Sequence, residues 1–227
     1  EAGIELALTN ALAAASLDYQ VLSGSAIEEA MQSGLIGNLR RQMTAYKLVL
    51  WTNGSYGYLS ENQELLLGSY LNGGGCALFS SQDHVYSKGV SYLLTDFMGI
   101  TTVGSDQGDS GSSLTLTATG SLYPENRPVS LSFTNQNYSD TITPSTSEAV
   151  FLYGETVAGV MNDSGSYLGI FTGFPIEAIV GDVERGDFIS RAVNACHYRH
   201  NVSVGYVAPE SAGDGAPEVP MGGDDVF

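Results

Sequence analysis

The sequence has few basic side chains and no long apolar run, and each shortage excludes a class of protein. Its 227 residues carry 8 lysines and arginines against 25 aspartates and glutamates, a formal net charge of -17. No basic stripe is available to neutralise nucleic-acid phosphates or to bind an anionic membrane surface. No apolar run approaches the roughly 18 residues that a membrane-spanning helix needs. We therefore expect neither nucleic-acid binding nor membrane insertion.

Cysteine is also scarce, because Cys76 and Cys196 are the only two and neither lies in a CxxC pair. This spacing argues against a cysteine-based metal centre. Two interpretations remain open for the pair: one long-range disulfide, or two buried thiols. We expect no cofactor.

Other metal ligands are sparse and poorly arranged. His197 and His200 are three residues apart near an expected helix end, with no third ligand apparent, so a surface role that offsets the helix dipole is favoured. Asp106 and Asp109 lie in a glycine-rich loop and are weak calcium candidates, because their spacing matches no known calcium loop. We therefore expect no metal site.

The sequence does have the composition of a globular domain, with 43% hydrophobic and only 15% charged residues. Four sequons, at Asn53, Asn137, Asn162 and Asn201, are candidate glycosylation sites. The chain begins at Glu1 without an initiator methionine, which is expected of a processed product or an excised region. Together these features favour an extracellular or cell-surface location.

Helix and strand patterns alternate through the first hundred residues. Continuous apolar runs at 46–51 and 76–80 have the length of strands that are buried on both faces of a parallel sheet. Between them, Ser60 and Gln63 form a capping box that predicts a helix ending near Gly73. The other elements predicted in the α/β part are helices at about 4–15, 26–44, 89–98 and 183–198 and a short strand at 19–22.

The pattern changes between about 104 and 162, where short alternating segments are typical of antiparallel strands. We interpret this stretch as a β-rich insertion in one α/β domain that covers residues 1–200. Residues 201–207 alternate like one further strand, and the rest of 201–227 is an acidic tail rich in glycine and proline.

Two segments, YKLVLWTNGSYGYLSENQELLLGSYLNGGGCALFSSQDHVY from residue 46 and YLGIFTGFPIEAI from residue 167, carry a family resemblance. The chain resembles the class I glutamine amidotransferase-like superfamily, in a divergent branch from secreted multidomain prokaryotic proteins, over most of residues 4–198. The resemblance implies a flavodoxin-like three-layer α/β sandwich with a mostly parallel sheet and a small antiparallel β insertion.

The resemblance also implies a site that has lost its chemistry. Catalytic members place a nucleophilic cysteine on the turn that here holds Ser81, and a histidine in a His-Pro-Glu run that here begins at Phe174 and ends at Glu177. A hydroxyl needs a neighbouring base, which phenylalanine cannot be, so Phe174 is expected to pack over an inactive site. A local group of Ser81, Asp83 and His84 is disfavoured because residues so close on a turn rarely converge; turn and helix capping is the simpler interpretation.

Members of the superfamily open with a central strand before the first helix, and here the first helix starts almost at residue 1. A gap inside a parallel sheet would leave backbone groups unpaired. Either an upstream segment fills it, or residues 201–207 fill it from the same chain or from a neighbouring copy.

The expected function is a non-catalytic, secreted or cell-surface structural or interaction module, able to assemble with protein partners or with copies of itself. One alternative is a hydrolase of the same superfamily with a rearranged site that uses Ser81 or Glu177. The other is a glycan-binding module, in which Trp51, Tyr56 and Tyr58 stack on sugar rings.

Overall fold

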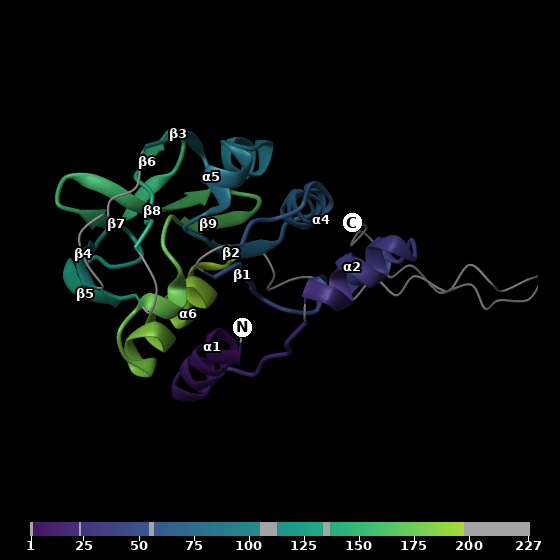
Figure 1. The fold of residues 1–227 in the computed structure, drawn as a ribbon, viewed down its shortest axis with the longest axis horizontal. Helices are drawn as coiled ribbons and strands as arrows, with labels where there is room; N and C mark the ends of the chain where they lie inside the picture. The colour runs from purple at the N-terminus through teal and green to yellow at the C-terminus, as the bar shows by residue number, and fades with distance from the viewer. Residues whose placement is uncertain (1, 23, 55–56, 105–112, 134–136, 198–227) are drawn as a thin grey trace, which may run out of the picture.

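A computed structural model describes residues 2–22, 24–54, 57–104, 113–133 and 137–197 (Figure 1). The helical elements are α1 (Ala2–Ala14), α2 (Gly24–Gln32), α3 (Ile36–Thr44), α4 (Glu61–Asn72), α5 (His84–Lys88), the π-helix η1 (Leu93–Phe97), the 3-10 helix η2 (Ile176–Ala178) and α6 (Asp182–Ala195). The strands are β1 (Val49–Thr52), β2 (Cys76–Ser80), β3 (Ile100–Val103), β4 (Ser113–Ala118), β5 (Arg127–Ser132), β6 (Ile142–Pro144), β7 (Glu148–Tyr153), β8 (Thr156–Asp163) and β9 (Leu168–Thr172). Among these helices, none combines the length and the apolar composition that crossing a membrane requires.

The strands form one mixed sheet of nine, in the order β1-β2-β9-β8-β7-β4-β5, with β6 joining β3 to β8. Among the described strands, only β1 with β2 and β2 with β9 pair in parallel. The other pairings are antiparallel. The predicted mostly parallel, flavodoxin-like sheet with a small antiparallel insertion is therefore wrong. The alternating segments do form antiparallel strands, but β8 pairs with β9 along its length and so fuses them with the parallel strands.

Helices cover both faces of the parallel part of the sheet, as the side chains of β2 show. Cys76 and Leu78 face a core that they share with α1 and α6, whereas Ala77 and Phe79 face a core shared with α3 and α4. All five residues of β2 are buried, as its continuous apolar run predicted. Figure 1 shows α1 and α6 lying together on one side of the sheet.

Several local predictions can be compared directly with the structure. The capping box of Ser60 and Gln63 is confirmed, and α4 ends just before Gly73. The helix predicted at 26–44 is two helices, because Gly34 between them has a left-handed φ of 72°. The segment predicted as a strand at 19–22 has no strand pairing. Where a helix was predicted at 89–98, the structure has the shorter π-helix η1, and α5 ends before this range.

The start of β2 is tied to the end of α6. Cys76 and Cys196 are joined by a disulfide, with their Cα atoms 5.9 Å apart. β2 pairs with β1 on one side and with β9 on the other, so the described sheet has no gap beside it. The predicted strand at 201–207 lies outside the described residues.

Candidate functional site

The loops that follow β1, β2 and β9 meet at the carboxyl ends of these strands, as the parallel arrangement predicts. The Thr52 hydroxyl donates to Glu177 Oε2 over 3.3 Å. Ser80 Oγ donates to the Phe174 carbonyl over 3.0 Å and accepts from the Ile176 amide over 2.7 Å. Ser80 thus fixes the late loop against the end of β2.

The hydroxyl of Ser81 does not face the ring of His84. It donates to the Gly57 carbonyl over 3.0 Å and accepts from the His84 backbone amide over 3.1 Å. The His84 ring is engaged on both sides, since Nδ1 accepts from the Leu59 amide over 3.3 Å and Nε2 lies 3.1 Å from Glu64 Oε1. Ser81 and His84 are therefore neighbours through the backbone and do not form a nucleophile and base pair.

His84 and Glu64 form a buried pair, and burial disfavours the charged form of each side chain. Burial lowers the pKa of His84 to about 4, and the nearby Lys88 charge acts in the same direction. Burial likewise raises the pKa of Glu64. His84 Nε2 and Glu64 Oε1 are 3.1 Å apart but are not aligned for a hydrogen bond. The contact is therefore a close polar pair in which the imidazole is neutral.

Glu177 and Phe174 occupy different environments. Burial raises the pKa of the Glu177 carboxyl, opposed by hydrogen bonds from its own backbone amide and Thr52 and by the charge of Arg185. Its Oε1 atom has no hydrogen-bond partner among the described residues. Phe174 is fully buried on the α6 side and meets Phe151 edge-on, with ring centres 5.3 Å apart. The residue expected to cover the site is thus a core residue.

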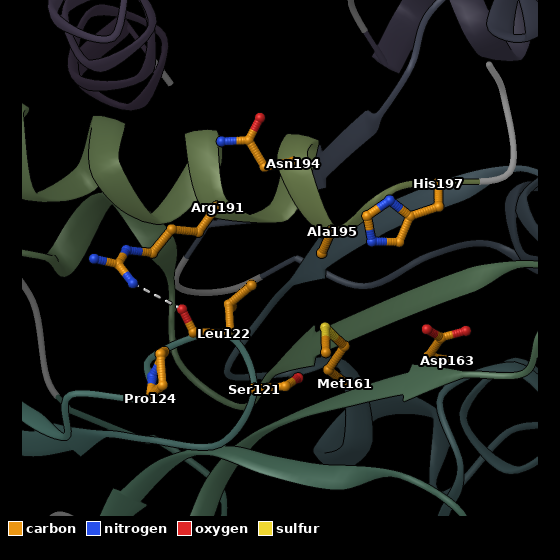
Figure 2. Close-up of a pocket in the computed structure, with 9 residues that line it drawn as sticks. All are labelled: Ser121, Leu122, Pro124, Met161, Asp163, Arg191, Asn194, Ala195 and His197. Carbon is orange, nitrogen blue, oxygen red and sulfur yellow. Dashed lines mark hydrogen bonds between the residues drawn. The ribbon is translucent and has the colours of Figure 1, made fainter.

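A pocket of about 480 Å³ lies at the opposite end of the parallel strands (Figure 2). It is an open pocket bordered by the turn before β5, the end of β8 and the last turns of α6. Asp163 of β8 pairs with Leu168 at the start of β9, which places the pocket at that end of the sheet. The lining residues are Ser121, Leu122, Pro124, Met161, Asp163, Arg191, Asn194, Ala195 and His197. Sequence reasoning missed this pocket, because three distant segments build it and none carries a motif.

Arg191 lines one side of the pocket and has several partners. Its Nη1 donates to the Leu122 carbonyl over 2.9 Å, and its guanidinium also binds Glu125 and Asp187 (Figure 2). The guanidinium carbon lies 4.4 Å from the centre of the Tyr123 ring, a cation-π distance. Asn194 and His197 are exposed, so their amide and imidazole groups are open to a ligand.

The aromatic residues proposed for sugar stacking are scattered. Trp51 is half-buried in β1, whereas Tyr58 is 51% exposed and lies beside Lys88, whose Nζ is 5.4 Å from the ring centre. Tyr86 on α5 is 86% exposed and had not been singled out from the sequence. Tyr56 lies outside the described residues.

The remaining candidate sites are placed only in part. Asp106, Asp109, His200 and Asn201 lie outside the described residues. Within the described ranges, no three His, Cys, Asp or Glu side chains gather as a metal site would require. The three sequon asparagines within those ranges are half-buried or buried; they are Asn53, Asn137 and Asn162.

The Asn162 amide donates to the Phe97 carbonyl over 2.9 Å and to the Tyr167 hydroxyl over 3.4 Å. Asn137 accepts from the Ser139 amide over 2.9 Å. A glycan on either residue would require its side chain to leave the interior.

No protein family and no curated protein matches the chain. Among solved structures, the GH42 β-galactosidase Gan42B of G. stearothermophilus matches with a TM-score of 0.50 and 15% identity, over 80% of this chain and 28% of that enzyme. A catalytic mutant of Gan42B matches with a TM-score of 0.50 and 16% identity, over 78% and 27%. An exo-β-1,4-mannosidase from Opitutaceae bacterium strain TAV5 gives 0.46 and 14%, over 68% and 26%.

These matches correct three expectations. The two matches with a TM-score of 0.50 are both structures of one glycoside hydrolase, so the assignment to the class I glutamine amidotransferase-like superfamily, and with it the flavodoxin-like description, is contradicted. The expected non-catalytic structural or interaction module is contradicted on the same ground. At this level of identity the likeness concerns the fold alone. The chain spans about a quarter of the length of the enzymes that it resembles.

Proposed function

We propose that this chain is a carbohydrate-binding domain that takes a neutral sugar in the pocket between α6, β8 and the turn at 121–124. The observation that carries the proposal is the mixed lining of this pocket. Asn194 and His197 offer exposed groups that can donate to or accept from sugar hydroxyls, while Pro124 and Met161 offer apolar surface for the C–H face of a sugar ring.

The size and charge of the pocket support a neutral ligand. A volume of about 480 Å³ lies within the range of roughly 300–1,000 Å³ that is usual for small-ligand sites. The Arg191 charge is balanced by Glu125 and Asp187, and the net charge of -17 opposes an anionic glycan. The shared fold with part of a β-galactosidase makes a sugar the ligand class to test first.

The proposed activity is binding without hydrolysis. Glycosidases hold two carboxyl groups on either side of the scissile bond, roughly 5 to 10 Å apart. Asp163 is the one carboxylate in the lining of the pocket, and its Oδ1 accepts from the Gly165 amide over 3.0 Å.

The test is a screen against an array of neutral and acidic glycans, followed by calorimetric titration of the best neutral oligosaccharide. Asn194→Ala and His197→Ala should each weaken binding by about 2- to 13-fold, which is the worth of one hydrogen bond. Asn72→Ala, an exposed asparagine on α4, is the matched control and should leave the affinity unchanged.

Two results would contradict parts of the proposal. If no neutral glycan binds, the proposed function is rejected. If a neutral glycan binds equally well to both pocket variants but is lost in Tyr86→Ala, the pocket is the wrong site and the exposed tyrosine on α5 holds the sugar instead.

A further inference from the structure

One edge of the sheet is left open at β1. Among the described residues, β1 pairs on one side only, with β2. The Asn53 amide donates to the Ser80 carbonyl of β2. Since alternate residues of a parallel strand address the same neighbour, the backbone of Trp51 also faces β2, whereas the N–H and C=O groups of Leu50 and Thr52 point to the open edge. Such an edge is a template for one more strand.

The amino end of this edge is basic. Lys47 lies two residues before β1, and Arg40 and Arg41 are exposed near the end of α3. No carboxylate in the described part of the chain forms an ion pair with these three side chains, whereas the other described arginines are all ion-paired. In a chain with a net charge of -17, this is a local concentration of positive charge that is not neutralised.

The carboxyl end of the same edge is acidic. The side chain of Ile4 on α1 lies so close to Gly54, which follows β1, that a Cβ at Gly54 would be 2.6 Å from Ile4 Cδ1. The next residue of α1, Glu5, is exposed. At this end Glu177 also accepts from the Thr52 hydroxyl. The two ends of the edge would therefore attract each other if a second copy bound with its strand running in the opposite direction.

Apolar side chains are exposed at both ends as well. At the amino end, Gln20 contacts the hydroxyl of Tyr46, and its neighbours Tyr19 and Val21 are 46% and 52% exposed. At the carboxyl end, Leu6 of α1 is 61% exposed. A stable interface buries roughly 1,200–2,000 Å², more than a strand of four residues supplies, so these flanking side chains have to contribute.

We infer that two copies of this chain join their β1 edges as antiparallel strands about a two-fold axis. In the register that uses both edge residues, Leu50 of each copy lies opposite Thr52 of the other, and each such pair exchanges both of its N–H···O=C hydrogen bonds. Trp51 then lies at the axis and meets Trp51 of the second copy as a cross-strand aromatic pair. Both copies use the same surface, as a two-fold interface requires.

This register brings the unlike ends of the two edges together. Leu48 lies opposite Gly54 of the second copy, so Lys47 comes close to Glu5 of that copy. The apolar side chains at 19–21 approach Leu6 of the second copy in the same way. Trp51 is only half-buried in the single chain and so has surface left to bury at the centre of the interface, where aromatic residues contribute most.

Light scattering and amide hydrogen exchange on the full chain, at rising protein concentration, test this dimer. The mass should rise from one chain to two, and exchange at Leu50 and Thr52 should slow over the same concentrations. Exchange at Trp51, whose amide faces β2, should stay constant and shows that the domain remains folded. Because Trp51 is the only tryptophan, its fluorescence should change with the same midpoint.

Charge reversal tests the register. Lys47→Glu and Glu5→Lys should each weaken dimerisation by about 2- to 30-fold, because two symmetry-related ion pairs are lost and each is worth about 1.4- to 5-fold. The double variant restores both pairs with the signs exchanged and keeps the net charge, so it should dimerise like the native chain. The matched control is Glu155→Lys in the exposed turn between β7 and β8, remote from β1, which should change the affinity by less than about 2-fold.

Three outcomes would overturn the inference. A mass of one chain at every concentration up to the millimolar range means that the edge does not join two copies. A dimer in which exchange at Leu50 and Thr52 does not depend on concentration uses another surface. Single charge variants that dimerise like the native chain, or a double variant that is no better than either, mean that the two ends of the edge do not meet.

Discussion

Reducing the disulfide between Cys76 and Cys196 should destabilise the domain by up to about 5 kcal/mol. The bond closes a loop with a sequence separation of 120 residues. The loop-entropy relation then gives about 16 cal/mol/K, or about 5 kcal/mol at 25 °C. A domain of this size is stable by about 5–15 kcal/mol, so the bond supplies a third or more of the total.

The position of the bond explains why the loss should reach the whole domain. It joins the amino end of β2, which pairs on both sides, to the end of α6, whose side chains fill the core shared with α1. Without it, the last turn of α6 is held by packing alone, and the unfolded chain regains the freedom of a long loop.

The assay is urea denaturation followed by circular dichroism, with and without a phosphine reductant. The matched control is the double variant Cys76→Ala/Cys196→Ala, whose unfolding free energy should not respond to the reductant. Alkylation of the unreduced chain unfolded in urea should label no cysteine. Two labelled thiols, or a reductant effect below about 1 kcal/mol, would refute the reasoning.

Gly186→Ala should lower the free energy of unfolding by about 1–3 kcal/mol in the same urea assay, because the new Cβ would lie 2.5 Å from the Ala11 carbonyl oxygen. The control is Gly37→Ala on α3, whose new Cβ meets nothing within 4 Å and which should raise the free energy of unfolding by about 0.5–1 kcal/mol. If Gly186→Ala leaves the free energy of unfolding unchanged, α1 and α6 are not packed this closely. The pKa of His84 is about 4 in the folded domain, against 6.5 for an unperturbed histidine. Protons therefore bind preferentially to the unfolded chain below pH 6.5, and the free energy of unfolding should fall as the pH falls toward 4, by about 2 kcal/mol between pH 7 and pH 5. Because the raised pKa of Glu64 acts in the opposite direction, the drop should be measured as the difference between wild type and His84→Gln, and equal pH dependence of the two would refute it.

Local sequence signals located the elements that meet the core on both faces of the sheet. The apolar run at 76–80 matches β2, and the capping box at Ser60 fixed the start of α4, because burial and capping depend on neighbours in sequence. The pairing of β8 with β9 could not be predicted in this way. Strand order depends on contacts between distant segments, and an alternating pattern looks the same in a separate insertion as in a continuous sheet.

The same distinction, between features set by neighbours in sequence and features set by distant contacts, applies to the candidate site. The meeting of Thr52, Ser80 and Glu177 followed from the rule that parallel strands end at one edge of a sheet. The pocket at the other end needs Leu122, Met161 and Asn194 to converge, and these residues have no common spacing or motif. Exposure at Asn194 is a property of the assembled fold, so no local pattern could have identified it.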